Sequence, residues 1–270
     1  MAKNQKKLSP RQAILKMAPY RPPSSGRGGK MRLDFNENTE GCSPRALERL
    51  RGLSADALAV YPEYEEARPR LASHFSVSPN QLTLTNGTDE AIQLVVNTYV
   101  NPGDRVLIPR PTYAMYRFYA QVIGAEVVEV EYGADLGFPQ KELLSKLHSR
   151  TRAIFIANPN NPTGTSASQA QLKAVLRAAP RAAVMVDEAY FEFSGQSVLP
   201  WIARYQNLFV SRTFSKAYGL AGLRVGCLFS NENNIAAIRK GQSPYSVNAA
   251  AVAAALEAAR DRAFIKRYVA

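Results

Sequence analysis

Between residues 82 and 240 the chain alternates short apolar runs with longer amphipathic segments, and this alternation restricts the fold more than any other feature of the sequence. A short apolar run bounded by turn residues is typical of a buried strand, and a longer amphipathic segment is typical of a helix. Strands that alternate with helices build a mostly parallel sheet with helices on both faces. The sequence therefore predicts an α/β fold, and its polar turns follow the strand ends, where such sheets bind ligands.

The expected elements of this region follow from the pattern. Strands are expected at residues 82–85, 105–109, 126–131, 152–157, 182–186, 207–212 and 226–230. Helices are expected at residues 86–99, 111–123, 139–148, 168–179, 232–240 and 246–259, and helical sequence continues or restarts through Tyr268.

The part of the chain before residue 82 is less regular. Met31–Phe35 has strand character, and Ser43 precedes a proline in the pattern of a helix start. A further helix is expected to open at Tyr61 and to run to about His74, with Pro69 inside it. Because proline lacks a backbone N–H, it should remove one hydrogen bond and bend that helix.

Length and composition limit the class of protein. The 270 residues suit one large domain with or without a small one, and 46% of them are apolar, enough for a sizeable core. Cys42 and Cys227 are too few for a disulfide framework, and we expect both to be inert packing residues. So few cysteines fit a reducing, cytoplasmic setting. No apolar run is long enough to span a bilayer, so no membrane partner is expected.

Part of the net charge of +12 lies in residues 1–30, which form a basic N-terminal arm. The arm has no acidic residue and contains Lys3, Lys6, Lys7, Arg11, Lys16, Arg21, Arg27 and Lys30. Three interpretations stay open: a tail that binds nucleic acid or a membrane surface, an organelle transit peptide, or an arm with a short helix, capped by Ser9, that packs on a partner subunit. No aromatic interleaving or nucleic-acid motif accompanies the charge, so we expect no nucleic-acid partner.

One lysine has the sequence context of a reactive amine. Lys216 follows an apolar run, and the glycine-rich segment 219–226 lets the backbone turn close to a ligand. Thr213 and Ser215 place hydroxyls beside the lysine, and Arg224 offers a fork for a phosphate. A lysine attacks an aldehyde only when part of it is neutral, which requires a buried, electropositive site. We therefore predict that Lys216 holds pyridoxal phosphate as a Schiff base.

Polar residues follow other strands in the same way. Asp187 ends a buried run, so its carboxylate must be paired, and a protonated pyridine nitrogen is a suitable partner. Asn161 and Tyr190 are placed to bind the phenolate oxygen of the same cofactor, and Tyr113 to lie against its flat ring. Gly87-Thr88-Asp89 brings N–H groups and a hydroxyl to a helix N-terminus, where a phosphate binds readily.

The order and spacing of these segments resemble the fold-type-I, class I/II pyridoxal-phosphate aminotransferases, and within them most of all the histidinol-phosphate aminotransferases. The resemblance covers roughly residues 30–258 and rests on residues 33–38 (LDFNEN), 61–62 (YP), 85–90 (TNGTDE), 110–116 (RPTYAMY), 158–164 (NPNNPTG), 186–190 (VDEAY), 213–216 (TFSK), 219–226 (GLAGLRVG) and 244–248 (PYSVN). The set is specific for the superfamily, whereas related enzymes share several of the motifs that indicate histidinol phosphate.

The resemblance implies a role for each candidate residue. Lys216 binds the cofactor and shuttles a proton, and Asp187 pairs with the pyridine nitrogen. Asn161 and Tyr190 bind the phenolate oxygen, and Tyr113 stacks on the ring. The residues expected around the phosphate are Gly87, Thr88, Asp89, Thr213, Ser215 and Arg224.

The same resemblance implies the reaction and the partners. In this family an amino group moves between histidinol phosphate and 2-oxoglutarate, so a phosphorylated amino alcohol or amino acid and a 2-oxo acid are the expected substrates. Asn36 lies in the segment that lines the approach of the substrate. Tyr61 reaches the cofactor phosphate of the neighbouring subunit, which implies a homodimer. No metal site is expected.

The resemblance also divides the chain. A cofactor-binding large domain is expected at residues 31–241, with residues 31–60 contributing in part to a small domain and to the substrate approach, and a small domain begins at residues 242–270. Members of the family continue past this point, so we expect a C-terminally truncated small domain that lacks the arginines gripping the acidic groups of the substrate. Three alternatives therefore stay open: an aromatic aminotransferase, a threonine-phosphate decarboxylase, and a cofactor-binding remnant without turnover.

Overall fold

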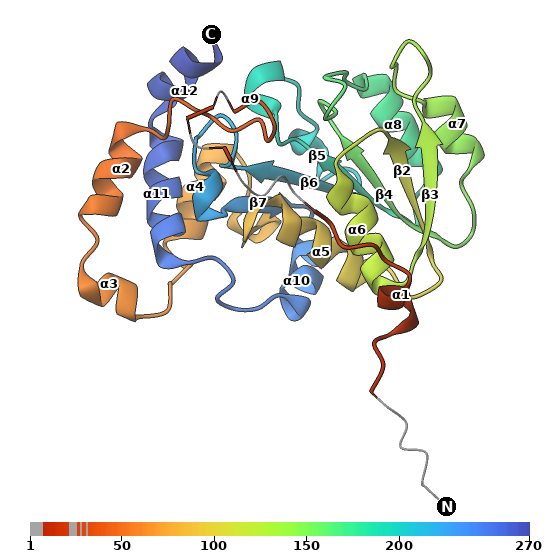
Figure 1. Cartoon of the computed structure of the whole chain (residues 1–270), viewed down its shortest axis with the longest axis horizontal. Coiled ribbons are helices and arrows are strands. Elements are labelled where there is room, and N and C mark those ends of the chain that lie inside the picture. The colour runs from red at the N-terminus through yellow and green to blue at the C-terminus, as the bar shows by residue number, and fades with distance from the viewer. Residues whose placement is uncertain (1–7, 22–25, 28, 31) are drawn as a thin grey trace, which may run out of the picture.

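A seven-stranded sheet with the order β1-β7-β6-β5-β4-β2-β3 forms the centre of the computed structural model, which describes residues 8–21, 26–27, 29–30 and 32–270 (Figure 1). The strands are β1 (Leu82–Thr85), β2 (Arg105–Arg110), β3 (Glu126–Glu131), β4 (Thr151–Ala157), β5 (Ala183–Asp187), β6 (Leu208–Thr213) and β7 (Gly226–Phe229). Strands β2 to β6 pair in parallel, whereas β7 runs antiparallel to both β6 and β1. The predicted mostly parallel α/β sheet is confirmed.

Helices cover both faces of this sheet (Figure 1). Those of the described residues are α1 (Gln12–Leu15), α2 (Pro44–Arg51), α3 (Ala55–Ala59), α4 (Ala67–Phe75), α5 (Gly87–Tyr99), α6 (Ala114–Ile123), α7 (Gln140–Ser145), α8 (Gln169–Ala178), α9 (Phe191–Ser194), α10 (Glu232–Gly241), α11 (Ala249–Arg260) and α12 (Arg262–Val269). Single 3-10 turns lie at Pro79–Gln81, Leu199–Trp201 and Ala221–Leu223. None of the helices described is long and apolar enough to cross a membrane.

The two cores follow from the alternation of side chains along buried strands. In β4, Ile154 and Ile156 join the core shared with α4, α8 and α11, whereas Ala153 and Phe155 join the core shared with α5, α6 and α10. Neighbouring residues at a strand end therefore point to opposite faces. This property decides where the polar residues of β5 and β6 lie.

The segments outside the regular region pack on the last long helix. Ser43 caps α2, because its side chain accepts the N–H of Arg45, as its sequence predicts. Helices α2 and α3 both contact α11, whose small alanine side chains are largely buried. The short helices α3 and α9 were not predicted, and the boundary between large and small domains at residues 241 and 242 stays a prediction.

Two predictions about the segment before β1 are wrong. Residues 32–35 form no strand, and Met31 lies outside the described residues. Helix α4 begins at Ala67 and not at Tyr61, so Pro69 falls in its first turn. The N–H groups of a first turn have no partner within the helix, and the proline therefore removes no intrahelical bond there.

The N-terminal arm also differs from its predicted form. Helix α1 has Arg11 as its N-cap residue in place of Ser9. The helix contacts α6 of the same chain, and the Arg11 guanidinium donates to the Val122 carbonyl at 2.8 Å. The basic residues Lys3, Lys6 and Lys7 lie outside the described residues.

Candidate functional site

Polar side chains from the ends of β5 and β6 and from the starts of α5 and α6 meet around a cavity of about 90 Å³. Its lining consists of Thr88, Asp89, Tyr113, Tyr116, Ala157, Pro159, Asn161, Asp187, Ala189, Tyr190, Thr213, Ser215, Lys216 and Arg224. The lining thus includes every predicted site residue except Gly87, Asn36 and Tyr61. Segments far apart in the sequence converge here because parallel strands end at one edge of the sheet.

Lys216 lies in the loop after β6, in a half-buried position. Its Nζ donates to the Phe35 carbonyl at 2.6 Å and lies 5.9 Å from the centre of the Tyr190 ring. Burial lowers the pKa of the Lys216 amine; nearby Glu37 opposes this change and Arg224 adds to it. The amine is thereby shifted toward its neutral, nucleophilic form, as a lysine that captures an aldehyde requires.

Asp187 ends β5 with its carboxylate buried, at 4% exposure. The Tyr116 hydroxyl donates to Oδ2 and the Ser211 hydroxyl to Oδ1, each at 2.7 Å. Burial raises the pKa of this carboxyl, and the two hydrogen bonds act in the opposite direction. A buried carboxylate held by neutral donors still attracts a cation strongly.

The sequence interpretation missed both of these donors, although a signal for each was present. Tyr116 follows Tyr113, the N-cap residue of α6, by three residues, so a helix starting there brings the two to the same side of its first turn. Ser211 precedes Thr213 by two residues, so the two share a face of β6.

The N-terminus of α5 forms a cradle for an anion. Gly87 has φ +72°, and a Cβ atom there would lie 2.7 Å from Nη2 of Arg224, so only glycine fits. The Thr88 Oγ1 atom is buried and has no hydrogen-bond partner among the described residues. Ser215 accepts from Thr213 at 3.0 Å and lies beside the Arg224 guanidinium at 3.5 Å. A buried hydroxyl, a cation and helix N–H groups suit a phosphate.

Asp89 links Arg224 to Tyr113 across the cavity lining. One of its oxygens accepts from the Arg224 guanidinium at 3.1 Å, and the other accepts from the Tyr113 hydroxyl at 2.7 Å. Burial raises the pKa of Tyr113, so its hydroxyl stays protonated and donates. The Asp89 carboxylate therefore holds the arginine and the tyrosine in place.

The loop after β4 brings Asn161 to the cavity. Its neighbour Asn160 braces this loop, because its amide oxygen accepts from Thr112 at 2.7 Å and its NH₂ group donates to the Pro111 carbonyl at 2.9 Å. Beyond Asn161 the cavity adjoins a hollow of about 440 Å³ that Asn36 also lines. The Asn36 amide donates to the Tyr190 hydroxyl at 2.9 Å, which places Asn36 at the mouth of the site.

Tyr61 lies outside the cavity lining. Its side chain is exposed and stacks on Tyr245, with ring centres 4.4 Å apart. Among the residues that the structure describes, no group of three or more His, Cys, Asp or Glu side chains is arranged to hold a metal ion.

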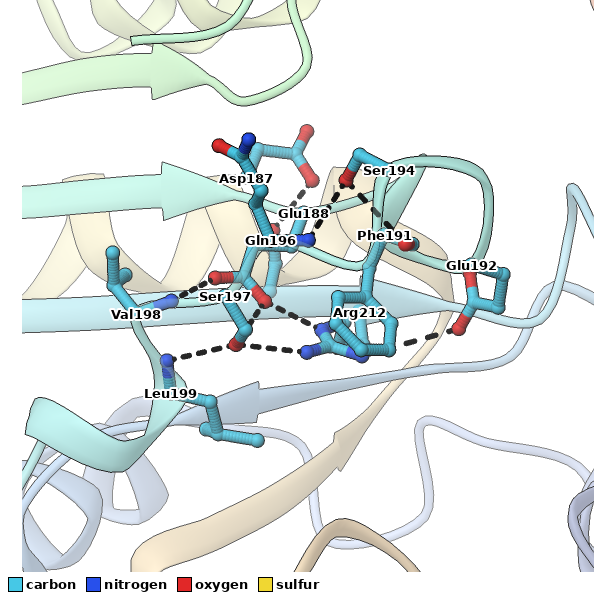
Figure 2. A network of polar contacts seen from close by, with 11 residues as sticks. Asp187, Glu188, Phe191, Glu192, Ser194, Gln196, Ser197, Val198, Leu199 and Arg212 are labelled. Atoms are coloured by element: carbon cyan, nitrogen blue, oxygen red, sulfur yellow. Dashed lines mark hydrogen bonds and ion pairs between the residues drawn. The ribbon is translucent and has the colours of Figure 1, made fainter. Parts of the chain in front are cut away.

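On the other face of the sheet, a buried ion pair joins the same two strand ends (Figure 2). The Arg212 Nε donates to Glu188 at 2.7 Å, and Nη2 donates to the Ser197 hydroxyl at 3.0 Å. The guanidinium carbon lies 3.4 Å from the centre of the Phe191 ring. Neither charged side chain is more than 5% exposed, so the pair depends on these internal partners.

A hollow of about 580 Å³ adjoins this ion pair and reaches α4 and α12. Glu192 lines it with one oxygen 3.9 Å from Arg212, and burial raises the pKa of Glu192 to about 7. His74 also lines it, with Nε2 3.1 Å from the Tyr218 hydroxyl. Burial lowers the pKa of His74 to about 4, with smaller contributions from Arg262 and Arg212.

The sheet order and the lysine-centred cavity define a class of protein. The family model for aminotransferases of class I and II matches residues 28–270, and the chain belongs to this family. Histidinol-phosphate aminotransferase 1 from Bacillus cereus (strain ZK / E33L) is 37% identical over 246 residues, which cover 88% of this chain and 66% of that protein. The chain thus spans about two thirds of the length of the curated relatives that it matches.

Solved structures share the fold. The histidinol-phosphate aminotransferase from Sinorhizobium meliloti, in complex with pyridoxal-5'-phosphate, superposes with a TM-score of 0.82 at 26% identity, covering 87% of this chain and 65% of that one. The L-threonine-O-3-phosphate decarboxylase from Porphyromonas gingivalis gives a TM-score of 0.70 at 27% identity, covering 82% of this chain and 66% of that one. The predicted family is confirmed.

Proposed function

We propose that this chain binds pyridoxal phosphate covalently through Lys216 and catalyses transamination between histidinol phosphate and 2-oxoglutarate. The observation that carries this proposal is the convergence, in one cavity, of a lysine with a lowered pKa, a buried carboxylate and an anion cradle. The family assignment, the names of the relatives and the cofactor bound by the Sinorhizobium meliloti protein support it.

The residues present fit the cofactor. The unpartnered Thr88 hydroxyl, the N-terminus of α5 and the Arg224 guanidinium would receive the phosphate, with Ser215 and Thr213 beside them. We propose that Gly87 keeps this cradle open. Asp89 contributes by holding Arg224 in place.

Pyridoxal phosphate supplies an electron-withdrawing ring that stabilises negative charge at the α-carbon of an amino substrate. The Asp187 carboxylate would hold the positive charge of the ring nitrogen, and Tyr116 and Ser211 fix its orientation. The Lys216 amine, biased toward its neutral form, moves a proton at the substrate α-carbon. Burial raises the pKa of Tyr190, so its hydroxyl stays protonated and can donate a hydrogen bond. We propose that this hydroxyl and the Asn161 amide bind the phenolate oxygen.

The substrate assignment rests on the relatives. Asn36 and Tyr190 meet at the hollow beside the cavity, and we propose this hollow as the approach of the substrate. The family likeness to the threonine-phosphate decarboxylase makes decarboxylation the alternative outcome for a phosphorylated amino acid. We further propose a cytoplasmic homodimer in which the exposed Tyr61 reaches the cofactor phosphate of the partner subunit.

A visible absorption spectrum tests the proposal. The purified chain is titrated with pyridoxal phosphate and then with histidinol phosphate, with Lys216→Ala as the control. We expect a visible band from the lysine-bound cofactor that histidinol phosphate abolishes and 2-oxoglutarate restores. The same band in Lys216→Ala would contradict the role of Lys216. A band that threonine phosphate alters with loss of CO₂, and that histidinol phosphate leaves unchanged, would favour the decarboxylase.

A further inference from the structure

We infer that Arg212, on the face of the sheet away from the cavity, is the positioning residue for Tyr190. The inference rests on the proposed function in one respect, because in that proposal the Tyr190 hydroxyl donates a hydrogen bond to the cofactor. Its structural basis is the pattern of contacts around a single guanidinium (Figure 2).

Tyr190 lies between two residues that Arg212 holds. Glu188, two positions before it, accepts from Nε at 2.7 Å, and the ring of Phe191, the next residue, packs 3.4 Å from the guanidinium carbon. Tyr190 itself has left the strand and precedes α9, which is only four residues long. A helix this short does not hold its own position, so the segment depends on contacts outside it.

The same guanidinium also fixes the far end of this segment. Ser197 accepts from Nη2 at 3.0 Å and donates to Glu188 at 2.8 Å. The other Glu188 oxygen accepts the N–H of Val198 at 2.6 Å. Residues 188 to 198 therefore form a loop whose two ends close on Arg212 and Glu188.

Asp187 has support that does not involve Arg212. It pairs with Ala157 of β4 and with Ser211 of β6 in the parallel sheet. Its carboxylate is also held by the Tyr116 hydroxyl. Loss of the guanidinium should therefore displace Tyr190 and leave Asp187 in place.

Arginine is required here because its planar fork donates in two directions at fixed angles. A lysine would keep the charge beside Glu188, so the buried carboxylate would not be left unpaired, but one ammonium cannot reproduce the contacts with Ser197 and Phe191. We therefore expect Arg212→Lys to fold and to loosen the segment. Misplacement by about 1 Å is enough to weaken a functional hydrogen bond severely.

A double-mutant cycle tests the coupling. The pyridoxal phosphate dissociation constant is measured for wild type, Arg212→Lys, Tyr190→Phe and the double variant. We expect each single variant to weaken binding about tenfold relative to wild type. The double variant should also bind only about tenfold more weakly than wild type, because either change alone already removes the hydrogen bond from Tyr190 to the cofactor. Weakening of about a hundredfold in the double variant would show independent effects and overturn the inference. The control Arg150→Gln, an exposed arginine paired with Glu126, should leave the constant unchanged.

Amide hydrogen exchange without added cofactor separates this inference from the proposed function. In Arg212→Lys we expect exchange at residues 188 to 198 to rise at least about tenfold, with β5 unchanged. Equal acceleration in β5, or no acceleration in the segment, would overturn the inference. A wild-type protein that binds no pyridoxal phosphate would defeat the proposed function and leave the exchange result standing.

Discussion

Asp187 and Glu188 are consecutive carboxylates, and their surroundings differ in one decisive way. Asp187 points to the cavity side and receives hydrogen bonds from hydroxyls, whereas Glu188 points to the opposite face and is paired with a guanidinium. Burial raises the pKa of both. The charge of Glu188 is paired with a guanidinium within the protein, whereas the Asp187 carboxylate is held by neutral hydroxyls.

The difference indicates how one strand end serves two purposes. The side-chain alternation of a strand separates the two carboxylates, so a buried ion pair and a carboxylate on the cavity side coexist without competing for one partner. Replacing Glu188 should therefore affect stability first, and replacing Asp187 should affect function first. Four variants test this contrast.

The largest expected effect comes from Glu188→Ala. Arg212 would then be a buried cation without its hydrogen-bonded partner, with Glu192 left as an acidic neighbour at 3.9 Å, which costs about 3–5 kcal/mol of unfolding free energy. Urea unfolding measures the change. The control Glu126→Ala, which breaks exposed pairs with Arg105 and Arg150, should cost no more than about 1 kcal/mol. Equal losses in the two variants would remove the distinction between the buried pair and the exposed ones.

Asp187→Asn should change turnover strongly and the free energy of unfolding only slightly. An amide can still hydrogen-bond to Tyr116 and Ser211, so the unfolding free energy should change by less than about 2 kcal/mol. Turnover should fall about tenfold to a hundredfold or more, because the variant loses the charge that we propose to face the pyridine nitrogen. Rates are compared with wild type, and Lys216→Ala defines the background. Unchanged turnover would mean that the cofactor does not lie against Asp187.

Glu192 sharpens the comparison, because it shares Arg212 with Glu188 at the longer distance of 3.9 Å. Burial raises the pKa of Glu192 from 4.5 to about 7, so the folded protein keeps a proton that the unfolded chain releases. This retained proton adds to the free energy of unfolding. The contribution is fully present below about pH 4.5 and is lost as the pH rises through about 7, by up to about 1.4 kcal/mol per pH unit.

Unfolding of Glu192→Gln and wild type across this range checks the prediction. The glutamine variant should gain stability relative to wild type as the pH rises toward 7. The lowered pKa of His74, about 4, gives the opposite slope below pH 6.5, but both proteins contain it and it cancels in the difference. A difference that stays constant with pH would show that Glu192 titrates as an ordinary carboxyl group.

The smallest effect is expected for Tyr116→Phe. The variant removes one neutral hydrogen-bond donor to Asp187. This loss should lower the free energy of unfolding by about 1 kcal/mol and raise the pKa of the Asp187 carboxyl further. Thermal unfolding and the pH dependence of cofactor binding measure the two changes. Tyr119→Phe, on the same helix, is the control, and an equal effect there would indicate general loosening of α6.

The sequence predicted the sheet and most of the cavity because their signals are local. Apolar runs mark β1 to β7, and turn residues after them place Asp187, Asn161 and Lys216 at strand ends. The reversed direction of β7 was not predictable in this way, because it depends on pairing with β1 and β6. Helix α4 was placed too early because the turn before it is as polar as a helix start.

Contacts between side chains on different elements were harder to predict than the positions of the residues along the chain. Asp89 was expected at the cofactor and lines the cavity, but the contacts of its carboxylate with Arg224 and Tyr113, which lie on other elements, were not predicted. The Arg212–Glu188 pair gave no motif signal of its own, because each residue belongs to a segment attributed to the cavity. Which face a charged residue takes depends on strand register, and register becomes visible only in the folded sheet.

The reversed strand β7 also sets the timing of assembly. The Arg224–Asp89 contact joins residues 135 positions apart, and β7 must enter between β1 and β6 before Arg224 reaches the N-terminus of α5. Contacts of such long range form late, and chains emerge from the ribosome with the N-terminal part first. A nascent chain therefore exposes β1 and α5 throughout the synthesis of the intervening strands, and the contact between Arg224 and Asp89 forms only when β7 has emerged.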